Sequence, residues 1–201
     1  MKHVILDYDV GNLASIKQAC DKVGLDTIVS KDPKIIKEAT SLILPGVGAF
    51  EDAMNSLIDS GLIPYIKDHI NKGKYLLGIC LGMQLLYTKS YEFGEHQGLD
   101  IFKGEIKKLD ISLKIPHMGW NNLQFDKVDP ILQYIKEDSY VYFVHSYYVS
   151  SSNEECIAST NYGVKIPAIV RNKNVYATQF HPEKSGAVGL NILKAYGELI
   201  S

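Results

Sequence analysis

The sequence predicts an α/β protein with an open, mostly parallel mixed sheet flanked by helices. Short β-branched runs alternate with amphipathic segments through the first half of the chain, which indicates strand–helix units and a parallel sheet. The apolar run Tyr75–Ile79 leads into Gly78-Ile-Cys-Leu-Gly82, a spacing typical of a tight turn from a strand into a helix. The second half reads as consecutive strands joined by turns, so the sheet is expected to be mixed.

In the first half, strands and helices are expected to alternate. Apolar residues at 13, 16, 19, 20 and 23 recur at helical spacing, which places Cys20 on the core face of a helix. The segment 49–71 reads as a helix broken at Pro64, because proline cannot continue the hydrogen-bond ladder. The expected strands are 3–7, 27–29, 41–44 and 75–79, with a short helix at 33–39.

The second half is dominated by short β-type runs and closes with a helix. Asn172-Lys-Asn174 predicts a hairpin turn. The closing helix is expected at 186–200, with Leu190, Leu193, Tyr196 and Ile200 on one face. The expected strands are 101–109, 122–125, 140–144, 147–149, 157–160, 168–171 and 175–178. Without a repeat or a linker, residues 1–201 are expected to form one domain.

Composition excludes several function classes. The chain has 21 basic and 23 acidic residues and a net charge of −2, without a basic run, so neither nucleic acid nor a membrane is an expected partner. No signal peptide is visible, because the first apolar stretch ends at Asp7. Cys20, Cys80 and Cys156 are widely spaced and form no C-x-x-C pair, which argues against disulfides and zinc. We therefore expect a cytoplasmic protein without a metal or cofactor.

Cys80 is the candidate nucleophile. A lone intracellular cysteine in an apolar run is more often a small buried hydrophobe. Here, however, Gly78 and Gly82 flank it in the pattern of a nucleophile elbow, and the start of the following helix favours a thiolate.

Near the end of the chain, His181-Pro-Glu183 supplies a candidate base and its orienting carboxylate. Side chains two residues apart on an extended backbone lie on the same side, and Pro182 disfavours helix at His181. The tripeptide alone fits a helix cap slightly better, and a metal pair is a further alternative. Together with Cys80, a Cys80–His181–Glu183 triad is the better interpretation.

The loop Pro45-Gly-Val-Gly48 follows another expected strand and is the candidate oxyanion loop. An ordinary turn is an equally good interpretation of its glycines. A glycine-rich segment beside a nucleophile can also present backbone N–H groups inward, as an oxyanion hole requires. The candidate donors are the amides of Val47 and of Leu81, the residue after the cysteine.

These motifs together resemble the class I (triad) glutamine amidotransferases, which have a flavodoxin-like fold. Pro45-Gly-Val-Gly48, Pro116-His-Met-Gly-Trp-Asn121 and Tyr142-Phe-Val-His-Ser-Tyr147 are similar in particular to the glutaminase subunits of imidazole glycerol phosphate synthase, an enzyme of histidine biosynthesis. The similarity covers nearly the whole chain. One departure is Asp9, where that family usually has glycine; aspartate tolerates a left-handed backbone better than most residues.

The resemblance implies hydrolysis of L-glutamine to glutamate and ammonia. Because unpaired charges are costly to bury, the charged ends of glutamine need polar partners. Glu92 would face the α-ammonium group, although it fits a solvated surface charge equally well. By resemblance, the residues of the glutamine pocket are Gly48, Gln84, Glu92, His145, Ser146 and Tyr147.

The chain contains no recognisable acceptor or nucleotide site, so the ammonia must be used on another chain. The resemblance implies a heterodimer with the cyclase subunit, which makes imidazole glycerol phosphate and aminoimidazole carboxamide ribotide. Trp, Tyr and Met are typical of interface centres, although Trp120 alone fits a core position equally well. The candidate docking residues are Asn12, Met118, Trp120, Asn121, Tyr140, Tyr142 and Lys184. Two alternatives remain: the glutaminase of another triad amidotransferase, or a non-catalytic binding module on the same fold.

Overall fold

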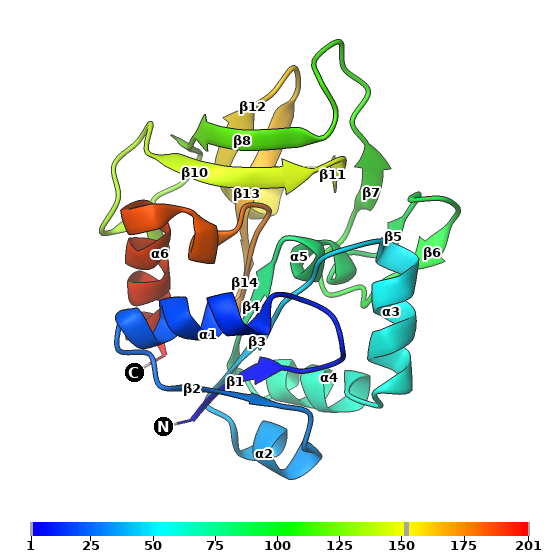
Figure 1. Ribbon diagram of the computed structural model, residues 1–201, viewed down its shortest axis with the longest axis vertical. Coiled ribbons are helices and arrows are strands. Elements are labelled where there is room, and N and C mark those ends of the chain that lie inside the picture. Colours follow the sequence, from blue (N-terminus) through cyan, green and yellow to red (C-terminus); the bar gives the residue numbers. More distant parts are fainter. Residues whose placement is uncertain (1, 151–152, 201) are drawn as a thin grey trace.

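The computed structural model describes residues 2–150 and 153–200, and its centre is a mixed sheet in the order β2-β1-β3-β4-β14-β13-β12-β9 (Figure 1). The first five strands in this order, β2, β1, β3, β4 and β14, pair in parallel. Strands β13, β12 and β9 then continue the sheet in antiparallel fashion. This arrangement confirms the expected fold class. The eight strands are β1 (His3–Leu6), β2 (Thr27–Ser30), β3 (Ser41–Leu44), β4 (Tyr75–Ile79), β9 (Gln124–Phe125), β12 (Cys156–Asn161), β13 (Lys165–Asn172) and β14 (Val175–Thr178).

Helices cover both faces of the parallel part of this sheet. Strand β3 shows how: Leu42 and Leu44 pack into the core beneath one set of helices, whereas Ile43 packs into the core on the opposite face. The first set is α2 (Pro33–Glu38), α3 (Phe50–Asp59), α4 (Ile63–Asn71) and α5 (Leu81–Leu85), and the second is α1 (Leu13–Lys22) and α6 (Gly186–Leu199). Burial on both faces explains why these strands read as continuous apolar runs.

The break between α3 and α4 precedes the proline rather than falling on it. Gly61 has a left-handed backbone with φ 68°, and it ends the first helix. Pro64 lies in the first turn of α4, where its missing N–H would have no helical partner in any case. The proline therefore begins the second helix.

The sequence predicted the antiparallel region less well. The expected strand 101–109 is reduced to β7 (Glu105–Lys108), because Asp100 (φ 58°) and Gly104 (φ 143°) place turns before it. The expected strand 122–125 divides into the end of β8 (His117–Asn122) and β9. Two short strands, β5 (Lys89–Ser90) and β6 (His96–Gln97), were not expected.

Two small sheets lie beside the main one. Strand β8 pairs with β10 (Tyr140–His145), so that Trp120 lies opposite Tyr142 and His117 lies opposite His145. Strand β11 (Tyr147–Val149) pairs with β7, which continues to β5 and β6. The β8–β10 pair, called the ribbon below, lies across the end of the main sheet in Figure 1.

The hairpin turn predicted at 172–174 is confirmed. Lys173 has φ 54° in the turn between β13 and β14, as a hairpin turn requires. Asp9 adopts the left-handed conformation, with φ 65°. Among the described residues, no helix is both long and apolar enough to span a membrane.

The order of the main sheet determines where the sequence motifs meet. Strands β3, β4 and β14 are neighbours and run in the same direction, so the residues that follow them emerge at one edge. Ligands of open α/β sheets bind at this edge, beyond the carboxyl ends of the strands. The residues after these three strands belong to the Pro45–Gly48 loop, the Cys80 turn and the His181–Glu183 segment.

Candidate active site

Cys80 lies at a strained turn between β4 and α5. Its backbone has φ 54° and ψ −109°, which is unusual for a residue with a side chain. The flanking glycines make the turn possible: a Cβ on Gly82 would lie 2.0 Å from the Leu44 carbonyl oxygen, and one on Gly78 would lie 3.0 Å from the Gly82 carbonyl oxygen. The strand-to-helix elbow expected from the sequence is therefore present.

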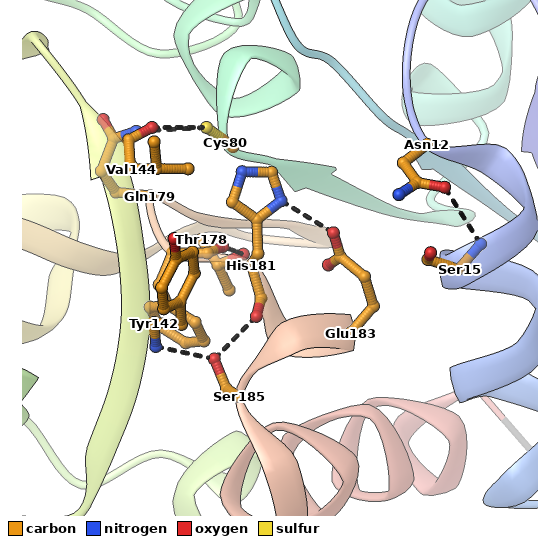
Figure 2. Close-up of polar contacts among 11 residues, drawn as sticks. Asn12, Ser15, Cys80, Tyr142, Val144, Thr178, Gln179, His181, Glu183 and Ser185 are labelled. Carbon is orange, nitrogen blue, oxygen red and sulfur yellow. Dashed lines mark hydrogen bonds and ion pairs between the residues drawn. The ribbon is translucent and has the colours of Figure 1, made fainter. Parts of the chain in front are cut away.

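His181 lies between Cys80 and Glu183 (Figure 2). Its Nδ1–H donates to Glu183 Oε1 at 2.7 Å, and both side chains are almost completely buried. Burial alone lowers the pKa of His181. The hydrogen bonds and charges of Cys80 and Glu183 outweigh this effect and raise the pKa to about 10. The ring is therefore held as an imidazolium, and its Nε2 edge is directed at Cys80 (Figure 2).

The backbone around His181 is fixed from the ribbon and from α6. The His181 amide donates to the Tyr142 carbonyl at 3.0 Å. Ser185 Oγ donates to the His181 carbonyl at 2.6 Å and accepts from the Tyr142 amide at 2.9 Å. Ser185, which the sequence did not single out, therefore ties β10 to the histidine (Figure 2).

The Pro45–Gly48 loop packs directly against the cysteine turn. A Cβ on Gly46 would lie 2.5 Å from the Gly82 amide nitrogen, so only glycine allows this approach. The buried Tyr8 hydroxyl donates to the Pro45 carbonyl and holds the start of the loop. Gly48 has φ 92° and open space around its Cα, and the Val47 side chain is exposed.

A pocket of about 350 Å³ opens at this edge of the sheet. The structure brings together there every residue assigned to the triad, the oxyanion hole and the glutamine pocket except Glu183, which lies behind His181. The residues that line it are Val47, Gly48, Cys80, Leu81, Gln84, Glu92, Pro116, Val144, His145, Ser146, Tyr147, His181 and Lys184. Among the described residues, no cluster of His, Cys, Asp or Glu is suited to hold a metal ion.

Gln84 and Glu92 also have internal roles. Gln84 Nε2 donates to the Tyr147 carbonyl at 2.9 Å and to Gln179 Oε1 at 3.0 Å. Glu92 Oε2 accepts from the Phe50 amide at 2.7 Å, at the first residue of α3. Burial raises the pKa of Glu92, and the bond from Phe50 opposes this shift. Glu92 is thus a pocket residue and also a helix cap, which the sequence did not indicate.

Gln179 is a pocket neighbour that the sequence analysis did not assign, although it directly precedes the Phe-His-Pro-Glu segment. It is completely buried, and its Nε2 lies 3.9 Å from Cys80 Sγ. The Val144 carbonyl lies 4.0 Å from the same sulfur. Its place directly after the expected strand 175–178 was the available signal for this residue.

The candidate docking residues divide between the two faces of the ribbon. Met118, Trp120, Tyr140 and Tyr142 share one face, on which Trp120 packs edge-on against Tyr142 with ring centroids 6.1 Å apart. Met118, Trp120 and Tyr140 are each more than half exposed. Asn121 is on the opposite face of β8.

Two further docking candidates lie outside the ribbon. Asn12 is exposed at the start of α1 and caps that helix through the Ser15 amide. Lys184 is exposed and lines the pocket.

Comparisons with known proteins agree with this geometry. Residues 4–195 match the family described as glutamine amidotransferase class-I. The subunit HisH of imidazole glycerol phosphate synthase from Caldanaerobacter subterraneus subsp. tengcongensis is 53% identical over 98% of this chain and 97% of its own length. The corresponding HisH from Lactococcus lactis subsp. lactis is 50% identical over 99% of both chains.

A structural comparison supports the same fold at much lower identity. The structure of PurLQS from Thermotoga maritima matches this chain with a TM-score of 0.78 and 16% identity. The match covers 100% of this chain and 99% of the other. At this identity the similarity concerns the fold alone. The family match and the two HisH relatives together show that the chain belongs to the class-I glutamine amidotransferases and, within them, to the HisH subunits of imidazole glycerol phosphate synthase.

Proposed function

We propose that this chain hydrolyses L-glutamine to glutamate and ammonia, and that it passes the ammonia to a cyclase subunit. The observation that supports this most directly is the convergence of Cys80, His181 and the Pro45–Gly48 loop on one pocket at the ends of three adjacent strands. A nucleophile, a proton carrier and a loop of backbone donors are the groups that amide hydrolysis requires.

In the proposed first half-reaction, the Cys80 thiolate attacks the side-chain carbonyl carbon of glutamine and forms a C–S bond. The carbonyl oxygen becomes an oxyanion, which accepts hydrogen bonds from the Val47 and Leu81 amides. His181 donates its proton to the amide nitrogen, the C–N bond breaks, and ammonia leaves. The raised pKa of His181 suits it to this step, because the ring carries a proton at neutral pH and can transfer it to the departing amide nitrogen.

In the second half-reaction, His181 is neutral and acts as the base. It takes a proton from a water molecule, whose oxygen attacks the thioester carbon. Collapse of this intermediate breaks the C–S bond, releases glutamate and returns the thiolate and imidazolium to their starting state. Glu183 orients the ring throughout, because its carboxylate accepts from Nδ1–H and leaves Nε2 to exchange protons.

The remaining pocket residues would recognise the amino-acid end of the substrate. Glu92 offers a carboxylate for the α-ammonium group, and Gly48, Ser146 and Tyr147 line the same pocket. Gln84 contributes its side-chain carbonyl, since its amide N–H groups are already bonded to Tyr147 and Gln179.

The cyclase partner would dock on the exposed face of the ribbon. Met118, Trp120, Tyr140 and Tyr142 form an aromatic and apolar surface there, which is the composition of interface centres. The relatives named above are subunits of imidazole glycerol phosphate synthase. The complex would therefore make imidazole glycerol phosphate and aminoimidazole carboxamide ribotide.

The test uses the complex of this chain with its cyclase. We expect Cys80→Ala to lower glutamine hydrolysis by on the order of 10⁴-fold or more, measured as glutamate release. The same complex supplied with ammonium salt should still form imidazole glycerol phosphate at the wild-type rate, because the thiol is needed only to release ammonia. Full glutamine-dependent activity in this variant would exclude Cys80 as the nucleophile.

A further inference from the structure

His145 lines the pocket, but neither of its ring nitrogens is free to bind a substrate. Nδ1 lies 2.9 Å from the Tyr147 carbonyl oxygen, and Nε2 lies 2.9 Å from Nδ1 of His117. His117 in turn has its Nε2 3.3 Å from Asn121 Nδ2. A chain of side chains therefore runs from the inward face of β8 to the pocket wall.

Only one arrangement of protons satisfies this chain. The Tyr147 carbonyl can only accept, so His145 carries its proton on Nδ1 and leaves Nε2 as an acceptor. His117 must then donate from Nδ1 and accept at Nε2. The orientation of the Asn121 amide agrees, because its Oδ1 accepts from the Asn122 amide at 2.9 Å and its Nδ2 donates to the Asn161 carbonyl at 3.0 Å.

The surroundings hold both rings in place and keep them neutral. His117 is stacked between Phe143 and Tyr162, with ring centroids 4.7 Å and 4.0 Å away. Burial lowers the pKa of His117 to about 4. The pKa of His145 is lowered to about 3, mainly by burial and further by the neighbouring His117 and His181. A second proton on His145 would also point at the His117 N–H, which excludes it geometrically.

At the pocket, this chain of hydrogen bonds ends at the Tyr147 carbonyl, which Gln84 also contacts. The Tyr147 carbonyl accepts from His145 Nδ1 and from Gln84 Nε2, so both of its lone pairs are used. Ser146 and Tyr147, which line the pocket, are therefore held between β10 and α5 by a fully bonded carbonyl.

We propose that His117 and Asn121 are positioning residues of the glutamine site, which act by holding His145 in its Nδ1–H form and so fixing the wall at residues 145–147. The inference rests on the proposed function, because it takes glutamine as the ligand of the pocket. It also assigns His145 a structural link to that wall rather than a direct bond to the substrate from its ring.

The kinetic test compares two substitutions of His117 in the complex. His117→Phe keeps the ring stack but leaves His145 Nε2 without a donor, and we expect the KM for glutamine to rise about tenfold while kcat changes much less. His117→Asn places a side-chain N–H near the position of Nδ1 and should recover most of the KM. His69→Phe is the matched control, because it removes another buried imidazole, one bonded to the Tyr75 carbonyl, and should leave KM unchanged.

Labelling of Cys80 separates the pocket wall from the thiol. In His117→Phe, alkylation by iodoacetamide should proceed at the wild-type rate, whereas labelling by the chloroketone analogue of glutamine should slow by about the same factor as KM rises. A wild-type KM in His117→Phe, or a His117→Asn variant no better than the phenylalanine variant, would overturn the proposal.

A spectroscopic measurement tests the proton arrangement without relying on catalysis. In ¹⁵N-histidine-labelled protein at pH 7, two-bond ¹H–¹⁵N spectra should show His117 and His145 as neutral rings protonated at Nδ1, whereas Nε2–H is the commoner form of free histidine. A protonated ring or an Nε2–H form at either residue refutes the relay. If the wild-type complex instead fails to release glutamate from glutamine, the proposed function fails while the spectrum still decides the relay.

Discussion

The parallel half of the sheet and the ribbon both contribute residues to one pocket, but they are built in different ways. Strands β1, β3 and β14 are buried at every position, whereas burial alternates along much of β10, and β8 is largely half-buried or exposed. The buried strands fix the backbone of Cys80 and His181 from both faces. The ribbon is anchored by one face only, which leaves the other face free for contact with a partner.

Each region also carries one histidine of the pocket, in opposite protonation states. His181, beside Cys80 and Glu183, is held charged, whereas His145, beside a carbonyl and a neutral imidazole, is held neutral. Both rings are buried, so burial does not explain the difference. The partner atom on Nδ1 and the group facing Nε2 decide which ring can deliver a proton.

The comparison between the parallel half and the ribbon can be tested by substitution, and the largest loss of turnover is expected in the loop after β3. Val47→Pro deletes the proposed oxyanion donor and should lower the glutaminase turnover of the complex by about 100- to 1000-fold, equivalent to about 2.7–4 kcal/mol of barrier. Val47→Ala keeps the amide and should stay close to wild type. Normal turnover in the proline variant, measured as glutamate release with liganded cyclase, would remove Val47 from the oxyanion hole.

The next effect tests how tightly the parallel half is packed. Gly82→Ala would place a Cβ 2.0 Å from the Leu44 carbonyl oxygen, and we expect the free energy of unfolding to fall by about 1–3 kcal/mol. Gly197→Ala is the matched control in α6, where the nearest atom outside the helix backbone would be 3.4 Å away; there alanine should be neutral or stabilise by up to about 1 kcal/mol. Urea titrations measure both. Equal stability of the two variants would contradict this account of the elbow.

The smallest expected effect is the pH dependence of stability, and its sign differs between the two histidines. The pKa of His181 is raised from 6.5 to about 10, so its contribution is fully present below pH 6.5 and is lost as the pH rises through 10. Glu183→Gln removes the charge partner and should cost about 1 kcal/mol at pH 6, with the difference from wild type shrinking toward pH 10.

His117 and His145 behave in the opposite sense. Their pKa values are lowered, so the unfolded chain takes up protons that the folded chain excludes as the pH falls below 6.5, and stability declines toward pH 4. His117→Phe should flatten this acid limb, whereas Glu183→Gln should leave it unchanged. Urea unfolding at pH 4.5, 6, 8 and 10 separates the two cases, and a steeper acid limb in His117→Phe would contradict the neutral pair.

The sequence predicted the parallel half well because its signals are local. Apolar runs such as 41–44 and the glycine spacing around Cys80 depend on residues that are close in the chain, and the observed β3 and elbow match them. Strand β14 lies in the second half of the sequence, where no alternating pattern places it, and its parallel pairing with β4, which brings His181 to Cys80, is known only from the structure.

The ribbon could not be predicted in the same way. Strand β8 contains His117, Gly119 and Asn121, none of which favours a strand by itself, and its conformation depends on pairing with β10 more than twenty residues later. The sequence also grouped Asn121 with the candidate docking residues. In the structure its side chain contacts His117 on the same face of β8 and donates to the Asn161 carbonyl, a contact that depends on the folded arrangement of the strands.

The two glycines beside Val47 differ in a way that determines how this loop can move. Gly46 is pressed against the backbone of Leu81 and Gly82, whereas Gly48 has no heavy atom within 4 Å of the position a Cβ would occupy. A rotation that reorients the Val47 amide would therefore be taken up at Gly48, because Gly46 is held by its contacts with the cysteine turn. Such a rotation would leave Cys80 in place, so the amide could turn toward or away from the oxyanion site while the nucleophile stays aligned with His181.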